Sequence, residues 1–266
     1  MKKKLLGIVL VMVILFSNVS VVDAADASGF VEDNTSDETL RDYHNTIISE
    51  GAFEVDEKGH LWVDELRNEN TKVADEYISE INHVNDLVDI GVGYFDVNGH
   101  FVCYDAETIE DNVYRYDKQK ERDDKYLAKY DAAYPILSAY KIASDNKRYI
   151  RDTFQSIAVV DPVSAYGATV AIWVGKVRTG GEWDYKNVNG YAPYNRKWTA
   201  YQKNKSSIKT SEWFGNYNYG FTGRVLFTKD TLLLGGDAVS YVHNKAVDSP
   251  DDKGAIVQGF NESNGV

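Results

Sequence analysis

Two runs of residues in the second half of the chain combine glycine, aromatic, amide and charged side chains at high density. The first extends from Arg178 to Lys186 and reads RTGGEWDYK, and the second extends from Trp213 to Gly223 and reads WFGNYNYGFTG. Glycine permits backbone conformations and close approaches that other residues reach only at a cost. Tyr and Trp combine a flat apolar body with a polar tip. We expect the two runs to form the floor of a functional site.

Asp184 and Lys186 are the candidate acid–base pair of this site, because a carboxylate and an ammonium group buried near each other acquire shifted pKa values. His243 is the third candidate catalytic residue, as a general base on a predicted helix. Substrate binding is assigned to cationic, aromatic and amide side chains of the two runs, which are Arg178, Trp183, Tyr185, Asn216, Tyr217, Asn218 and Tyr219.

The second run has two interpretations. In an extended chain, Asn216 and Asn218 point to one side while Tyr217 and Tyr219 point to the other, so that the amides can hold a sugar or a phosphate. A packing loop whose amides bind buried backbone groups explains the same composition equally well.

Asp248, Asp251 and Asp252 form a candidate acidic group farther along the chain. Ser249 can cap a helix there and Pro250 suits its first turn. Favourable interaction with the helix dipole accounts for the three acids without any chemistry, and a carboxylate metal site is the more specific alternative. We expect no metal and no cofactor. The motifs of serine hydrolases, zinc peptidases and nucleotide-binding proteins are absent from the sequence.

The first 24 residues have the form of a signal peptide. Lys2, Lys3 and Lys4 precede the apolar stretch 5–16, and small residues end at Ala24, where we place the cleavage site. This apolar stretch is shorter than the ~20 residues of a membrane-spanning helix, and no other segment of the mature chain is suited to span a bilayer. The mature protein is therefore expected to be secreted. Cys103 is the only cysteine, so an intramolecular disulfide is excluded.

Charge divides the chain unevenly. Residues 25–130 contain 10 basic and 27 acidic side chains, whereas residues 131–266 contain 16 basic and 13 acidic ones. The difference favours two units with different duties, of which the second is the one able to approach a polyanion. We place the signal peptide at residues 1–24, a flexible leader at 25–40, an acidic α+β unit at 41–125 and a second domain at 126–266.

The predicted fold class is α+β. The acidic unit contains two similar hairpin signals forty residues apart, at 55–64 and 95–104, with an amphipathic helix at 71–87 between them. His60 and His100 follow the turn glycines and are expected to be exposed. The second domain is expected to be mainly helical, with a Gly/Tyr-rich loop, short strands such as 224–227, and helices at 146–158, 163–177, 232–244 and 251–260.

Three runs in this order resemble the polymorphic toxin type 44 family: Val177 to Lys186, Phe214 to Gly223, and Asp248 to Asp252. The resemblance covers roughly residues 130–266. In the third run Pro250 precedes Asp251 and Asp252, whereas in the family it follows an Asp pair. The resemblance implies a secreted effector that acts on other cells, with a nuclease-like or other hydrolytic activity and a partner immunity protein that neutralises it.

We expect a secreted toxin whose C-terminal domain cleaves RNA, with His243, Asp184, Lys186 and Arg178 as base, acid and phosphate-binding cations. A cell-envelope glycan or peptidoglycan hydrolase is the second hypothesis, with Asp184 and either Asp251 or Asp252 as its carboxylate pair. A non-catalytic secreted module that binds a glycan or a protein is the third.

Overall fold

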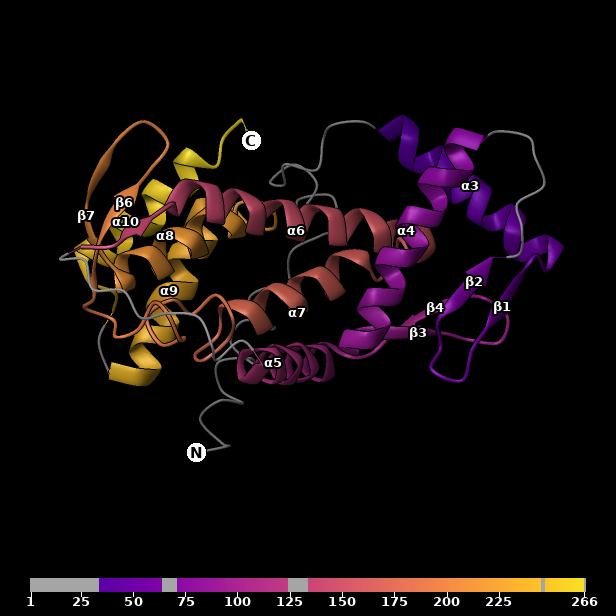
Figure 1. Cartoon of the computed structure of the whole chain (residues 1–266), viewed down its shortest axis with the longest axis horizontal. Coiled ribbons are helices and arrows are strands. Elements are labelled where there is room, and N and C mark those ends of the chain that lie inside the picture. The colour runs from indigo at the N-terminus through magenta and orange to yellow at the C-terminus, as the bar shows by residue number, and fades with distance from the viewer. Residues whose placement is uncertain (1–33, 64–70, 124–133, 245–246, 266) are drawn as a thin grey trace. The chain divides into compact units, whose positions relative to one another are not determined.

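The computed structural model describes residues 34–63, 71–123, 134–244 and 247–265 (Figure 1). The described residues form an α+β fold of long helices and three small sheets. They divide into an N-terminal unit, residues 31–120 and 150–176, and a C-terminal unit, residues 121–149 and 177–266. The predicted signal peptide lies outside the described residues, and the linear boundaries at residues 40 and 125 stay a prediction.

The N-terminal unit begins with a helix–hairpin arrangement that occurs twice. The first copy consists of α3 (Asn34–Glu50), β1 (Phe53–Val55) and β2 (Leu61–Val63). The second consists of α4 (Thr71–Ile90), β3 (Gly93–Phe95) and β4 (Phe101–Cys103). Each pair of strands is antiparallel, so both predicted hairpins are confirmed. Helices α5 (Ala106–Asp123) and α7 (Ala165–Val177) follow in the chain.

The same pair of side-chain hydrogen bonds stabilises both hairpin turns. Asp56 Oδ1 accepts hydrogen bonds from the backbone N–H groups of Lys58 and His60, at 2.9 and 3.0 Å. Asp96 accepts the equivalent two bonds forty residues later, at the same distances. Because a short carboxylate can replace a backbone acceptor in this way, the Asp-x-x-Gly sequence specifies the turn in both copies.

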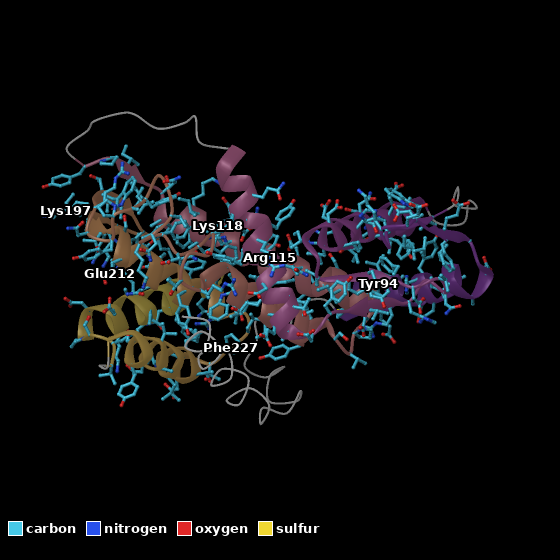
Figure 2. The ribbon with its side chains drawn as sticks, turned by 90° about the horizontal axis from the view of Figure 1, so that it is seen from below. Tyr94, Arg115, Lys118, Lys197, Glu212 and Phe227 are labelled. Carbon is cyan, nitrogen blue, oxygen red and sulfur yellow. The ribbon has the colours of Figure 1, made fainter. Side chains whose placement is uncertain are left out.

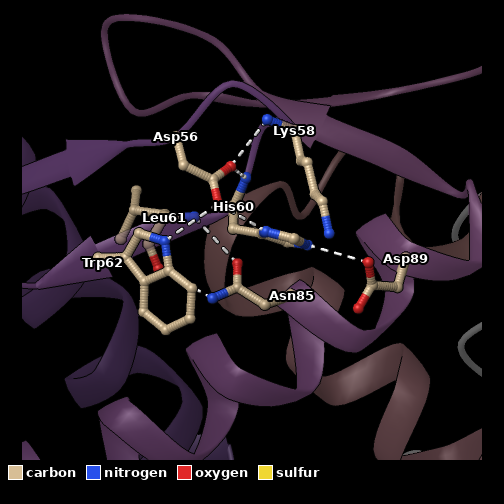
Figure 3. A network of polar contacts seen from close by, with 7 residues as sticks. All are labelled: Asp56, Lys58, His60, Leu61, Trp62, Asn85 and Asp89. Carbon is tan, nitrogen blue, oxygen red and sulfur yellow. Dashed lines mark hydrogen bonds and ion pairs between the residues drawn. The ribbon is translucent and has the colours of Figure 1, made fainter.

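The expectation of an exposed histidine is wrong for His60, which is only 7% exposed. Figure 3 shows its ring between two carboxylates, with Nδ1 2.9 Å from Asp56 Oδ2 and Nε2 3.3 Å from Asp89 Oδ1. The contact with His60 is the largest cause of a lowered pKa at Asp56. Asn85 of α4 accepts from the backbone N–H of Leu61 and donates to its carbonyl, so polar contacts join the first hairpin to α4.

The core of the N-terminal unit follows the predicted helical periodicity. In α4 the predicted apolar face supplies Tyr77, Ile81, Val84 and Leu87, all at most 3% exposed. Helices α5 and α7 add a buried ion pair, in which Lys176 Nζ lies 2.7 Å from Asp117 Oδ1. Two opposite charges at this distance compensate each other's loss of hydration.

The C-terminal unit contains a three-stranded sheet, the start of α6 and three further helices. Strand β5 (Ile136–Leu137) runs parallel to β6 (Lys197–Tyr201), and β6 runs antiparallel to β7 (Ser206–Thr210). The helices are α6 (Ala139–Val160), whose second half belongs to the N-terminal unit, α8 (Ser211–Gly223), α9 (Lys229–Asn244) and α10 (Pro250–Glu262). The last three pack side by side (Figure 1).

Two elements of this unit differ from the prediction. Residues 224–227 form a turn and not a strand, and their apolar side chains are nevertheless buried. Strands β6 and β7 lie between the two aromatic runs, where no strand was predicted, because the lysines and serines there hide the alternation that identifies a strand.

The run from Trp213 to Gly223 is helix α8, so the expected extended conformation and Gly/Tyr-rich loop are wrong for this segment. Thr210 caps the helix, and its side chain accepts a hydrogen bond from the backbone N–H of Trp213 at 3.1 Å. Phe214, Tyr217, Asn218 and Phe221 recur at spacings of three and four and are fully buried. Burial of this face outweighs the low helix propensity of its Gly, Asn and Tyr residues.

Candidate functional site

The loop between α7 and β6 is organised by the carboxylate of Asp184. Asp184 Oδ2 accepts hydrogen bonds of 2.7 Å from the backbone N–H of Gly180 and from Asn187 Nδ2. Gly180 has φ +79°, a left-handed conformation that glycine adopts without strain. The Asp184 side chain is buried, at 3% exposure, and this pattern of bonds holds the loop closed.

The aromatic side chains of the same loop lie in the core. Trp183 packs edge-to-face against Tyr149 at 6.1 Å, and Tyr185 stacks on Phe214 of α8 at 4.3 Å. Both loop side chains are 5% exposed. Asn146 Nδ2 donates to the Tyr185 hydroxyl at 2.8 Å, and burial raises the pKa of that hydroxyl. The loop is therefore anchored so that Lys186, the next residue, has a defined position.

Helices α8 and α10 approach each other at two glycines. A Cβ atom on Gly220 would lie 2.1 Å from the carbonyl oxygen of Ile256, and one on Gly259 would lie 1.9 Å from that of Tyr217. No larger residue fits at these positions, since real Cβ atoms do not come so close to a neighbouring backbone. The glycines thereby bring the polar end of α8 next to the N-terminus of α10.

A hydrogen bond joins the two helices at that end. Asn216 Nδ2 donates to Asp252 Oδ1 at 2.6 Å. The other oxygen of Asp252 accepts from the hydroxyl of Ser249 at 2.7 Å, and the Ser249 hydroxyl also accepts from the Asp252 backbone N–H as the cap of α10. Both oxygens of Asp252 are therefore fixed in orientation.

Asp248 lies between α9 and the start of α10. Ser240 donates to its carboxylate, and its backbone N–H donates to Asp237 Oδ1 at 3.0 Å. Lys253 Nζ pairs with Asp237 at 2.8 Å. The pKa of Asp248 is raised, mainly because the carboxylate is partly desolvated and also because Asp252 and Asp237 are negatively charged.

Glu212 completes this group from the first turn of α8 (Figure 2). Its pKa is raised, chiefly by desolvation and then by the charges of Asp252 and Asp248, while Lys186 acts in the opposite direction. We call Glu212, Asp237, Asp248 and Asp252 the carboxylate cluster. A half-buried carboxyl group with a raised pKa is the usual form of a general acid in hydrolytic enzymes.

Lys186 is the member of the predicted acid–base pair that acts electrostatically on the cluster. Its charge lowers the pKa of both Glu212 and Asp248, and its side chain is half-buried. Asp184, its expected partner, is engaged with Gly180 and Asn187 instead. Four of the predicted site residues are thus assembled here, namely Lys186, Asn216, Asp248 and Asp252.

The remaining predicted residues lie elsewhere. Arg178 is half-buried at the start of the loop, and Asp251 is exposed beside the cluster. Tyr217 and Asn218 are fully buried, with Tyr217 donating to Glu262 at 2.8 Å and Asn218 accepting from Asn146 at 2.9 Å. The partly buried Tyr219 donates to the carbonyl of Leu232 at 3.2 Å. The side chain of His243, on α9, lies outside the described part of the structure.

Sequence reasoning missed Glu212 and Asp237. Glu212 stands one residue before the aromatic run, and an acid at a helix start needs no function to explain it. Asp237 is one polar residue within a predicted helix. The signal that could have found Glu212 is its position immediately beside the most unusual run of the chain.

Two features are absent from residues 34–63, 71–123, 134–244 and 247–265. Among these residues, no group of three or more His, Cys, Asp or Glu side chains is arranged to hold a metal ion. Within the same ranges, none of the helices has the length and apolar character needed to cross a membrane.

No curated protein and no solved structure matches the chain. The matching family model covers less than half of the chain and includes the whole carboxylate cluster. Residues 172–264, in the C-terminal part of the chain, match the model of the family described as bacterial toxin 44.

Proposed function

We propose that the protein is an exported bacterial toxin whose C-terminal unit is a glycoside hydrolase acting on a cell-envelope glycan. The observation that carries this proposal is the Glu212 carboxyl group, which is half-buried, has a raised pKa and faces the charges of Asp252 and Asp248. Glycoside hydrolysis needs two carboxyl groups, one of which keeps its proton while the other stays available as base or nucleophile.

Glu212 is the acid in this assignment. Desolvation and neighbouring negative charges keep its proton bound to a higher pH than in water, so it can donate that proton to the leaving glycosidic oxygen. Asp252 is the second carboxylate, because the bonds from Asn216 and Ser249 fix both of its oxygens. The acid–base role thereby moves from Asp184, which organises the loop, to Glu212.

The balance of charge favours a neutral substrate over RNA. Four carboxylates form the cluster, while among the described cations Lys186 acts electrostatically on Glu212 and Asp248, and Lys253 pairs with Asp237. A polyphosphate that enters such a site meets net repulsion. The RNA-cleaving hypothesis keeps second place, on the observation that Lys186 supplies a cation next to both raised carboxyl groups.

Export rests on the signal peptide proposed for residues 1–24, and a cognate immunity protein is consistent with the toxin family. The proposal is tested by expressing the full chain in a bacterial host, with residues 1–24 either retained or removed. Growth arrest only with residues 1–24 present, together with release of reducing ends from purified cell-wall sacculi, is the expected result.

Glu212→Gln and Asp252→Asn should each reduce that release by about 100-fold or more. Asp251→Asn is the matched control, because Asp251 is the exposed neighbour of Asp252. Arrest that requires removal of residues 1–24, accompanied by RNA degradation, would instead establish the second hypothesis. Full activity of Glu212→Gln on every substrate would exclude the acid assigned here.

A further inference from the structure

The β6–β7 hairpin is the most basic part of the C-terminal unit. The stretch from residue 187 to residue 211 contains five basic residues and no acidic residue, in a chain whose formal net charge is −12. The five are Arg196, Lys197, Lys203, Lys205 and Lys209. Such a local excess of positive charge attracts an acidic partner. We call residues 196–210 the basic hairpin.

The outward face of the sheet carries exposed apolar side chains on its two outer strands. Trp198 and Ala200 of β6 are buried, so the alternate residues of that strand point outward. Thr199 pairs with Ile136 of β5 and with Ile208 of β7, which are 68% and 49% exposed. An exposed row of this kind is suited to contact with another protein chain.

Strand β7 is an edge of the sheet as far as the structure describes the chain. The bonds from Gln202 N to Lys205 O and from Ser211 N to Arg196 O fix the register of the ladder. In an antiparallel pair the bonded positions alternate, so the backbone N–H and C=O groups of Ser206 and Ile208 point away from β6. No described residue bonds to these groups. They form a template for one more strand.

We propose that the β7 edge binds an extended segment of an acidic partner protein, which adds a fourth strand to the sheet. Lys197 and Lys205 then bind acidic side chains of the partner, and Ile208 of β7 contacts an apolar one. Backbone bonds supply affinity and alternate side chains supply specificity in such strand addition. This goes beyond the glycan hydrolysis proposed above, because strand addition at the β7 edge binds a protein and uses no residue of the carboxylate cluster.

The basic hairpin suits a protein better than a nucleic acid. A phosphate backbone requires several available cations along its path. Lys203 Nζ donates to the carbonyl of Asn264 at 2.9 Å, while Arg196 and Lys209 lie over the rings of Trp198 and Trp213. Lys197 and Lys205 are the two of the five without such a contact among described residues. Two cations beside an open strand edge match an acidic strand more closely than a polyphosphate.

Binding of a model strand tests the proposal. The probe is a fluorescent ten-residue peptide in which glutamate and valine alternate, and its anisotropy is measured with the purified full chain. We expect saturable binding that weakens by about tenfold when alternate peptide nitrogens are methylated, because methylation removes the strand's donors without changing its charge.

Variants of the protein distinguish binding through the backbone groups of the β7 edge from binding through charge alone. Ile208→Pro removes an N–H that points to the open edge and leaves the β6 ladder intact, so peptide affinity should fall about tenfold. Lys197→Glu with Lys205→Glu should produce a similar loss. Lys229→Glu, on an exposed position of α9, is the matched charge control and should have little effect.

Three results would overturn the proposal. One is absence of peptide binding, and another is equal binding of the N-methylated peptide, which would reduce the interaction to charge. The third is tighter binding of a twelve-residue oligouridylate that competes with the peptide, since this would make the basic hairpin an RNA surface. Each readout is a binding measurement, so none depends on the hydrolytic activity proposed for the cluster.

Discussion

Asn216 of α8 donates a 2.6 Å hydrogen bond to Asp252 of α10, thirty-six residues farther along the chain. This bond connects two of the motifs that resemble the toxin family and holds one oxygen of the carboxylate to which we assign the second catalytic role. It exists because Gly220 and Gly259 let the two helices approach. The polar contact and the glycine contact are thus parts of one arrangement.

Asn216→Ala should lower both stability and activity. Loss of a hydrogen bond to a partly buried carboxylate costs about 1–2 kcal/mol, and Asp252 then loses one of its two orienting donors. Chemical unfolding measures the first effect and sacculus hydrolysis the second. Asn261→Ala, at an exposed position of the same α10, is the control. Equal activity of the two variants would remove Asn216 as a positioning residue.

The helix contact makes a second prediction. Gly220→Ala and Gly259→Ala should each destabilise the C-terminal unit by about 3 kcal/mol or more, because the new methyl group would overlap a backbone carbonyl. Gly254→Ala is in the same α10, is exposed and has nothing within 4 Å of its added Cβ atom. It should stabilise the helix by about 0.5–1 kcal/mol. Thermal unfolding of the three variants measures these changes, and equal unfolding temperatures for all three would contradict the prediction.

The carboxylate cluster should reduce stability at neutral pH. The folded state raises the pKa of Glu212 and Asp248, so their contribution is favourable below the ordinary carboxyl pKa and is lost as the pH rises through the raised value. Glu212→Gln should therefore unfold at a higher temperature than the natural chain at pH 7, and this difference should vanish near pH 3. A pH series of thermal unfolding curves provides the measurement.

The same titration predicts the pH profile of activity. Because Glu212 acts as an acid, hydrolysis should decline as the pH rises past its raised pKa. Glu212→Asp should retain some activity and shift this alkaline limb, whereas Asp251→Asn should not move it. An identical alkaline limb in the Glu212→Asp variant would indicate that another group sets the profile.

Asp184→Ala should lower the stability of the fold and affect hydrolysis only as a consequence. The substitution leaves the Gly180 N–H and the Asn187 amide without their acceptor, at a cost of about 3 kcal/mol. Asp184→Asn keeps one acceptor oxygen and should be milder. Stability and activity measured on the folded fraction separate the two roles. If Asp184→Ala were as stable as the natural chain but had lost all hydrolytic activity, Asp184 would be a catalytic residue.

Elements whose structure is determined by neighbouring residues in the chain could be predicted from the sequence, whereas elements determined by tertiary contacts could not. The periodic apolar residues of α4 and the hairpin signals at 55–64 and 95–104 are local, and both were predicted correctly. The run from Trp213 to Gly223 was misassigned because Gly220 serves the contact with α10, which the sequence of α8 alone does not reveal. Composition favoured a loop, and tertiary packing favoured a helix.

The candidate site divides in the same way. Lys186, Asn216, Asp248 and Asp252 belong to unusual runs and were selected by composition, and the structure brings them together. Glu212 was missed because its raised pKa arises first from burial and then from the charges of Asp252 and Asp248, and both causes depend on tertiary structure. Trp183 and Tyr185 were predicted to bind substrate because aromatic residues are common in binding sites. Both side chains are buried in the core, where aromatic residues are equally common.

The turn glycines of the two hairpins contact each other's repeat in both directions. A Cβ atom on Gly59 would meet Tyr94 of the second hairpin, and one on Gly99 would meet Phe53 of the first. Such reciprocity is the geometry of a two-fold dimer, in which each copy uses the same surface to bind the other. Each of the two turns is covered by the other copy, so a side chain added at either glycine would disturb both repeats.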